Sequence, residues 1–182
     1  MVLIIDNYDS FVFNVAQILE EAGVACAVRK NDDSSILDGG FDCAVISPGP
    51  GIPAESGLLM RFVEKFSRGK LLGICLGHQA ICGFFGARLR RIIPAHGVQS
   101  ELTDIDLTDP LWRGVSDFRV GRYHSWSVDQ PNLPQCLRVI ARADNEIMAV
   151  RLSGTKTYGL QFHPESFLTP AGGQMLRNWL SL

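Results

Sequence analysis

The chain has 182 residues, of which 46% are hydrophobic and 20% charged, and its formal net charge is −2. This size and composition predict a single globular domain, residues 1–182, with a sizeable core. The scattered charges provide neither a basic surface for nucleic acid nor a membrane anchor, and no apolar run suits a signal peptide or a bilayer span. We therefore expect a cytoplasmic protein.

The cysteines are odd in number and include no Cys-x-x-Cys pair. They are Cys26, Cys43, Cys75, Cys82 and Cys136. This set favours neither a disulfide framework nor a zinc site, so we expect reduced thiols and no bound metal.

The first half of the chain alternates between strand-like and helix-like patterns. The apolar residues 2–5 predict a buried strand, and a helix follows that Asp9 or Ser10 can cap and that Gly23 ends. Residues 24–29 predict a second strand. Such alternation predicts right-handed crossovers and a parallel sheet.

The third predicted strand, residues 41–47, runs into Ser-Pro-Gly-Pro-Gly at 47–51. Ligand sites of open α/β sheets lie at the carboxyl ends of strands, and this loop leaves backbone amides free to face a developing oxyanion. On its own the segment would also fit an ordinary turn. An amphipathic helix over residues 58–66 follows the loop.

Residues 71–80, Leu-Leu-Gly-Ile-Cys-Leu-Gly-His-Gln-Ala, predict a strand that turns sharply into a helix. Gly73 and Gly77 flank Cys75 with the spacing of a nucleophile elbow, in which cysteine replaces the usual serine. The turn strains the central residue, and the helix N-terminus favours a thiolate. The alternative is a buried, unreactive cysteine.

After Gly86 the pattern changes to short β-like runs separated by turn residues. These runs are residues 87–93, 98–102, 118–123, 137–143, 147–151 and 157–162. They predict antiparallel additions to the sheet. The expected fold is therefore α/β, an open, twisted, mostly parallel sheet flanked by helices, with antiparallel strands in the C-terminal half.

The last predicted strand runs into His163-Pro164-Glu165. Residues two apart on an extended chain point to the same face, so His163 and Glu165 can lie side by side. A cysteine nucleophile needs a base, and that base needs a group that fixes its tautomer. Cys75, His163 and Glu165 can fill these three roles, although a purely structural histidine is the alternative.

The combined motifs resemble the class I glutamine amidotransferases over essentially the whole chain, a family with a flavodoxin-like sheet. The matching segments are Ser-Pro-Gly-Pro-Gly at 47–51, Gly-Ile-Cys-Leu-Gly-His-Gln at 73–79 and Gln-Phe-His-Pro-Glu-Ser at 161–166. Asp-Asn-Tyr-Asp-Ser-Phe at 6–11 and Arg-Tyr-His-Ser at 122–125 are similar to the small subunits of anthranilate synthase and 4-amino-4-deoxychorismate synthase.

The resemblance implies that Cys75 attacks the side-chain amide of glutamine and forms a γ-glutamyl thioester. The N–H groups of Leu76 and Gly49 would hold the oxyanion, His163 would protonate the ammonia and activate water, and Glu165 would orient the imidazole.

The resemblance also implies that Gly51, Gln79, Ser125 and Trp126 line the glutamine pocket, the last two through backbone groups. It implies no cofactor on this chain. The ammonia would pass to a larger chorismate-binding subunit that carries Mg²⁺, docked near residues 9–11 and near His96 and Gly97.

Two residues depart from the family pattern. Val98 stands where related subunits have lysine, which leaves the docking mode open, and Trp126 stands where they have leucine. Anthranilate synthesis is the first choice of pathway, and aminodeoxychorismate synthesis or a shared subunit is the alternative. Two other functions are alternatives. A cysteine hydrolase or peptidase on a similar scaffold would lack the combination of Gln79 and the 47–51 loop. An inactive scaffold protein would not need Cys75, His163 and Glu165.

Overall fold

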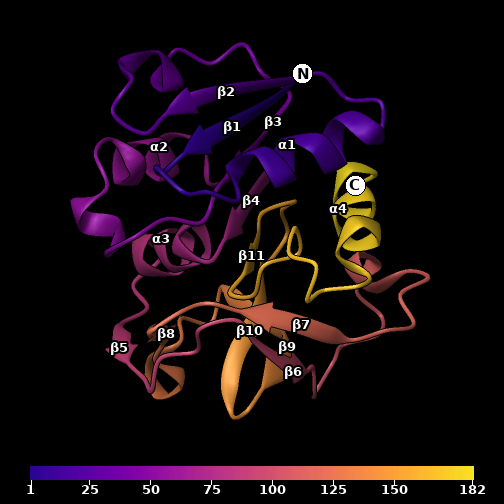
Figure 1. Cartoon of the computed structure of the whole chain (residues 1–182). Coiled ribbons are helices and arrows are strands. Elements are labelled where there is room, and N and C mark those ends of the chain that lie inside the picture. Colours follow the sequence, from indigo (N-terminus) through magenta and orange to yellow (C-terminus); the bar gives the residue numbers. More distant parts are fainter.

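The computed structural model describes residues 1–182, built around one seven-stranded sheet (Figure 1). In spatial order the strands are β2 (Cys26–Lys30), β1 (Val2–Asp6), β3 (Cys43–Ile46), β4 (Leu71–Ile74), β11 (Tyr158–Leu160), β10 (Glu146–Leu152) and β9 (Leu137–Ala143). The first five strands of this order are parallel, and β10 and β9 are antiparallel to their neighbours. The predicted α/β class with a mostly parallel sheet is confirmed.

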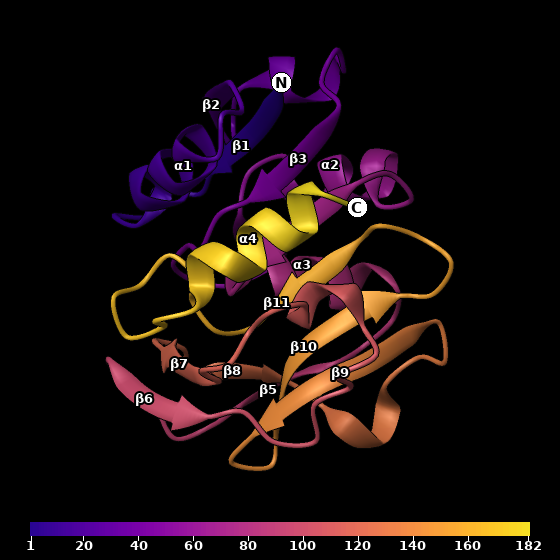
Figure 2. The same cartoon turned by 90° about the vertical axis from the view of Figure 1, so that its right-hand side faces the viewer.

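The helices cover both faces of this sheet. They are α1 (Val12–Glu21), α2 (Leu59–Phe66), α3 (Leu76–Phe84) and α4 (Gly172–Leu180). One core contains side chains of α1 and α4, and a second contains those of α2 and α3. Figure 2 shows α1 and α4 on the same side of the sheet.

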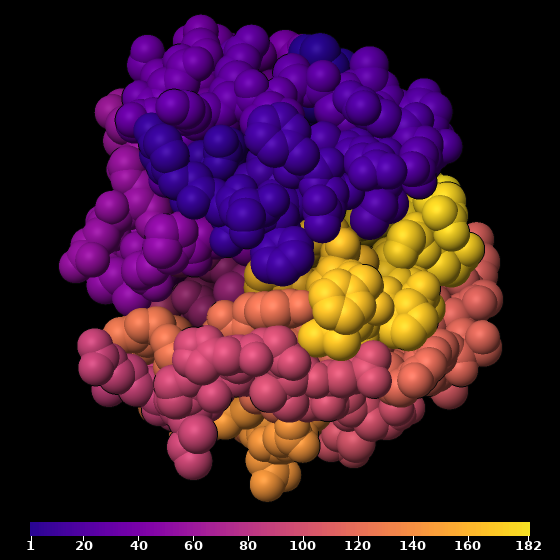
Figure 3. Space-filling view, viewed as in Figure 1, coloured from indigo at the N-terminus to yellow at the C-terminus, as the bar shows by residue number.

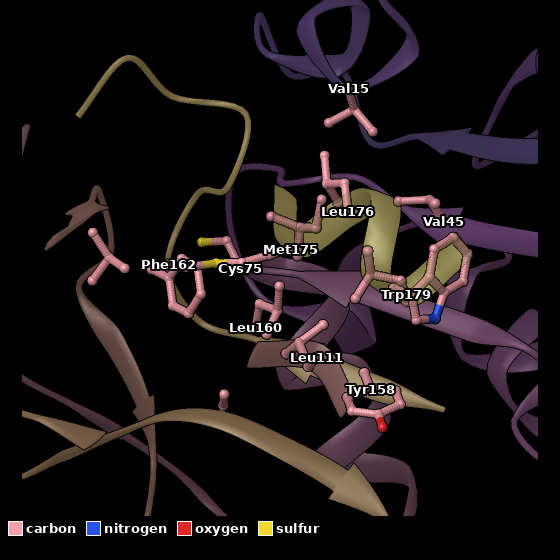
Figure 4. Close-up of a cluster of buried hydrophobic side chains, with 14 of the residues drawn as sticks. Val15, Val45, Cys75, Leu111, Tyr158, Leu160, Phe162, Met175, Leu176 and Trp179 are labelled. Carbon is pink, nitrogen blue, oxygen red and sulfur yellow. The ribbon is translucent and has the colours of Figure 1, made fainter. Parts of the chain in front are cut away.

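Strand β1 shows why both faces are buried. Val2 and Ile4 belong to the core with α1 and α4, whereas Leu3 and Ile5 belong to the core with α2 and α3. Successive side chains of a strand point to opposite faces, so a continuous apolar run fits a sheet covered on both sides. Figure 4 shows part of the first core, which includes Cys75.

The runs of the C-terminal half are strands, but only two of them add antiparallel strands to the main sheet. Strands β5 (Leu89–Arg91) and β8 (Trp126–Val128) form one separate ribbon, and β6 (Val98–Glu101) and β7 (Arg119–Arg122) form another. Strand β11 lies parallel to β4. The expectation that all six runs extend the sheet as antiparallel strands is therefore wrong in this detail, because apolar alternation predicts a strand without specifying its partner.

Two helical details also differ from expectation. Neither Asp9 nor Ser10 is the N-cap of α1; Phe11 is, and Asp9 accepts a hydrogen bond from the Phe11 N–H at 2.8 Å. Helix α4 was not predicted, because it begins with Gly172 and Gly173, which are poor helix formers.

Short 3₁₀ turns occupy four connections: Ser34–Leu37, Pro53–Glu55, Pro110–Trp112 and Gln130–Asn132. None of the helices has the length and apolar character that a membrane span requires. All five cysteines are unpaired.

Candidate active site

Cys75 lies at the turn between β4 and α3 in a strained conformation. Its φ is +50° and its ψ is −99°, a region that residues with a side chain rarely adopt. The turn is tight: a Cβ on Gly73 would lie 2.3 Å from the carbonyl group of Gly77, and one on Gly77 would lie 2.6 Å from the carbonyl oxygen of Ile46. The predicted nucleophile elbow is thus present, with its sulfur at a helix N-terminus.

The Ser-Pro-Gly-Pro-Gly loop follows β3, and Asn7, just after β1, fixes it. The Asn7 N–H donates to Ser47 Oγ at 3.0 Å, and Asn7 Nδ2 donates to the Ser47 carbonyl at 2.9 Å. The two strand ends meet where the strand order reverses around β1, which is the usual ligand position of such sheets. Asn7 has a positioning role that sequence reasoning missed.

Gly49 packs directly against the start of α3. A Cβ on Gly49 would lie 2.5 Å from Asn7 Cβ and 2.6 Å from Leu76 Cδ2, so only glycine fits. The Gly49 N–H has no hydrogen-bond acceptor within the protein, and Leu76 is the first residue of α3, where backbone amides lack an intrahelical partner. Two amides are therefore available beside the thiol.

His163 and Glu165 form a buried pair, as the two-residue spacing predicts. His163 Nδ1–H donates to Glu165 Oε1 at 2.7 Å, and the two side chains are 3% and 0% exposed. The backbone is fixed as well, since the His163 N–H donates to the Gly121 carbonyl at 3.0 Å and Thr169 Oγ1 donates to the His163 carbonyl at 2.6 Å.

The electrostatics of His163 connect it with Cys75. Burial by itself lowers the pKa of His163, but interactions with Cys75 and Glu165 outweigh burial and raise the pKa to about 10. His163 Nε2 is buried and makes no hydrogen bond within the protein. Nδ1 is thus occupied by the carboxylate, and Nε2 is available for proton transfer to or from the thiol.

A polar cavity of about 130 Å³ opens beside Cys75, with room for roughly four water molecules. Its lining combines the elbow, the 47–51 loop and the segment that leads into β8. The lining residues are Gly49, Pro50, Gly51, Cys75, Gln79, Tyr123, His124, Ser125 and Trp126. All four residues predicted for the glutamine pocket line it, while Tyr123 and His124 were not assigned. Figure 3 shows the groove between the two halves of the chain.

A chain of polar contacts connects Trp126, on one side of this cavity, with Cys75 on the other. Gln79 Nε2 donates to the Trp126 carbonyl at 3.1 Å and to Gln161 Oε1 at 3.3 Å, and Gln161 Nε2 lies 3.6 Å from Cys75 Sγ. Sequence reasoning assigned no role to Gln161. Its place two residues before His163, on the same face of an extended segment, was the available signal.

His124 also supports the Trp126 carbonyl. Arg122 Nε–H donates to His124 Nε2 at 3.2 Å, so His124 Nδ1–H donates to the Trp126 carbonyl at 2.9 Å. Burial lowers the pKa of His124 to about 4. The imidazole is therefore neutral near pH 7, and both of its nitrogens have partners.

No three His, Cys, Asp or Glu side chains come together in a way that could hold a metal ion. The polar groups that line the cavity are instead backbone groups, one thiol and the side chains of Gln79, Tyr123, His124 and Ser125, which suit a small polar organic molecule.

The family model for "Glutamine amidotransferase class-I" matches residues 3–181. The chain belongs to the class I glutamine amidotransferases. This amidotransferase is 42% identical to anthranilate synthase component 2 of Mycobacterium tuberculosis over 99% of this chain and 81% of the relative. It is 41% identical to aminodeoxychorismate synthase component 2 of Klebsiella aerogenes over the full length of both.

A third relative carries both names. The amidotransferase is 40% identical to aminodeoxychorismate/anthranilate synthase component 2 of Bacillus subtilis, over 99% of this chain and 95% of the relative. Among solved structures, a glutamine amidotransferase from Thermotoga maritima superimposes with a TM-score of 0.75 at 18% identity, covering 99% of this chain and 96% of that one. This last likeness concerns the fold alone.

Proposed function

We propose that this chain, as a single domain over residues 1–182, is the glutaminase component of a synthase that makes anthranilate from chorismate. The observation that carries the proposal is that Cys75 and Gly49 line one small polar cavity, while the buried His163–Glu165 pair interacts with Cys75 and the free amide of Leu76 follows it directly in the chain. A nucleophile, an oriented base and oxyanion donors are the parts that amide hydrolysis requires.

In the first half of the reaction His163 takes the proton of Cys75, and the sulfur attacks the side-chain carbonyl carbon of glutamine. The N–H groups of Leu76 and Gly49 hold the oxyanion of the tetrahedral intermediate. The carbon–nitrogen bond then breaks as His163 gives its proton to the leaving ammonia. The raised pKa of His163 suits the first proton transfer, because an imidazole beside Glu165 and Cys75 readily accepts the proton of the thiol.

In the second half His163 takes a proton from water, which attacks the γ-glutamyl thioester. Glutamate leaves, and the proton returns to the sulfur. Glu165 keeps the imidazole in one tautomer and stabilises its charged form throughout.

Gly51, Gln79, Ser125 and Trp126 hold the substrate. Gln79 Nε2 donates hydrogen bonds to the carbonyl oxygens of Trp126 and of the Gln161 side chain. Gln79 Oε1 is therefore free to accept a hydrogen bond from a donor group of the substrate glutamine. Trp126 contributes through its backbone, which Gln79 and His124 hold in place. The replacement of leucine by tryptophan at this position therefore leaves the polar contacts unchanged.

The acceptor of the ammonia is a larger chorismate-binding subunit, which also holds Mg²⁺; this chain carries no cofactor. Phe11 packs against Tyr123 and His163 with ring centroids 5.3 and 5.4 Å apart, and Gly97 donates to the Arg122 carbonyl. The expected docking segment 9–11 thus contacts the catalytic His163, and the segment 96–97 pairs with the end of β7, just before the cavity residue Tyr123. The complex would work in the cytoplasm.

The same chemistry serving 4-amino-4-deoxychorismate synthase is the second candidate. The relatives from Klebsiella aerogenes and Bacillus subtilis carry that name at 41% and 40% identity, close to the 42% of the anthranilate relative. Sequence similarity therefore fits both candidates, and the identity of the amine must decide between them.

The test begins with the tagged chain purified from its own cells and identification of the chorismate enzyme that co-purifies with it. The purified pair then receives glutamine and chorismate, and chromatography measures glutamate and the amine. We expect anthranilate, with only weak glutamate production by the isolated chain. Aminodeoxychorismate alone would select the second candidate, and both amines would indicate a shared subunit.

Cys75→Ala should lower glutamate formation about a thousandfold or more, whereas Cys136→Ala removes an exposed thiol and should leave it unchanged. If the purified pair made glutamate but no amine from chorismate, the proposal that chorismate accepts the ammonia would be wrong. Unchanged turnover in Cys75→Ala would overturn the mechanism, whereas no glutamate from the purified pair would favour an inactive scaffold.

A further inference from the structure

Gln161 is fully buried and contacts the sulfur of the nucleophile. Its side-chain nitrogen lies 3.6 Å from Cys75 Sγ, within the range of a hydrogen bond to sulfur. It comes from the segment just after β11, on the opposite side of the chain from Phe162 and next to the catalytic pair in sequence.

The orientation of the Gln161 amide is fixed by its other neighbour. Gln79 Nε2 is a donor, so the Gln161 atom that faces it at 3.3 Å must be the carbonyl oxygen. Gln79 is itself oriented, because the same Nε2 donates to the Trp126 carbonyl, which is an acceptor only. Gln161 must therefore present its NH₂ group to the sulfur.

We propose that Gln161 is a positioning residue that holds Cys75 Sγ and favours its thiolate form, with Gln79 holding Gln161 in turn. This role rests on the proposed glutaminase chemistry, to which it adds a link between the substrate pocket and the nucleophile. A hydrogen bond to a charged acceptor is stronger than one to a neutral acceptor, so a donor at this position stabilises the thiolate more than the thiol. It also fixes the direction from which the sulfur meets the substrate carbon.

The test measures alkylation of Cys75 by iodoacetamide between pH 6 and pH 10, followed by mass spectrometry of the peptide that contains Cys75. The full-length chain is used without glutamine or partner. Gln161→Met keeps the length of the side chain but removes the donor, and Gln161→Glu keeps the acceptor for Gln79. The matched control is Gln17→Met, which removes an exposed amide from α1.

We expect both Gln161 variants to react about tenfold more slowly than wild type at pH 7. The difference should shrink as the pH rises toward 10, because added base then replaces the help of the Gln161 donor. Gln79→Met should slow the reaction about threefold, and this effect should disappear in the Gln161→Met background, because Gln79 acts through Gln161. Gln17→Met should match wild type.

Equal rates for wild type and Gln161→Met at pH 7 would overturn the proposal. So would a loss of the same size at every pH, which would mean that the variant had only altered access or folding. Since alkylation needs no glutamine, a chain without glutaminase activity would overturn the proposed function while this measurement still decided the role of Gln161.

Discussion

His163 Nδ1 and Glu165 Oε1 lie 2.7 Å apart in a site where both side chains are almost completely enclosed. The second carboxylate oxygen of Glu165 has no hydrogen-bond partner. A buried carboxylate is stable in the charged form only beside a compensating charge. Each of the two side chains therefore stabilises the charged form of the other. The charged imidazole in turn interacts with the thiol of Cys75.

Glu165→Gln should test this dependence. The amide keeps the shape but removes the charge, so the pKa of His163 should fall and glutamine turnover should drop about a hundredfold or more, with a smaller change in KM. Steady-state glutamate production and a titration of His163 by NMR measure the two effects. Glu101→Gln, at an exposed position of β6, is the matched control. Full turnover in Glu165→Gln would exclude an electrostatic role.

The backbone conformation of Cys75 should lower the stability of the protein. Its φ of +50° disfavours any side chain, so Cys75→Gly should be about 1 kcal/mol more stable than Cys75→Ala. At Cys82, in the interior of α3, the order should reverse by about 1 kcal/mol because glycine weakens helices. Urea unfolding of the four variants measures both differences. The same order at both positions would show that the elbow stores no strain.

Gly172 and Gly173 allow a matched test of how closely α4 packs against Pro164, the residue between His163 and Glu165. A Cβ on Gly172 would lie 1.8 Å from the Pro164 carbonyl oxygen, whereas one on Gly173 would meet only the end of the Arg177 side chain at 3.3 Å. Gly172→Ala should destabilise the protein by about 2 kcal/mol or more and lower turnover. Gly173→Ala should keep turnover and gain about 0.5 kcal/mol. Thermal unfolding and glutaminase assays distinguish these outcomes.

His78 should make the protein sensitive to acid. Burial lowers the pKa of His78 to about 3, whereas an unfolded histidine has a pKa of about 6.5. The unfolded chain thus binds more protons below pH 6.5, so the stabilising contribution is present above that pH and is lost as the pH falls toward 3. The slope is up to about 1.4 kcal/mol per pH unit.

Urea unfolding at pH 7, 6 and 5 should therefore show a shallower decline in His78→Met than in wild type, although the variant is less stable at pH 7. His96→Met removes an exposed histidine and should keep the wild-type slope. Parallel slopes for wild type and His78→Met would contradict the assignment.

The parts of the site that could be predicted from sequence are those fixed by local chain geometry. The two glycines around Cys75 define a turn, and the spacing of His163 and Glu165 defines a shared face. The contacts of Asn7 with Ser47 and of Gln161 with Cys75 depend on which strands become neighbours. A polar side chain inside a motif does not reveal its partner, so these roles needed the structure.

The same distinction applies to the fold. The first four strands and their helices follow from apolar runs and breakers, whereas β8 is too short to give a pattern and α4 begins with two residues that disfavour helices. Tertiary packing supplies what α4 lacks, because Met175, Leu176 and Trp179 enter the core beside α1.

The pairing of β11 with β4 has a consequence for folding. Cys75 is 86 residues from Gln161, and both ribbons and the β9–β10 hairpin lie between β4 and β11 in the sequence. Contacts between such distant segments form late. A chain that has assembled only its first four strands thus lacks the contacts of Cys75 with Gln161 and His163, and full activation of the thiol requires completion of the sheet. The reactivity of this one sulfur is therefore an internal reporter of native folding.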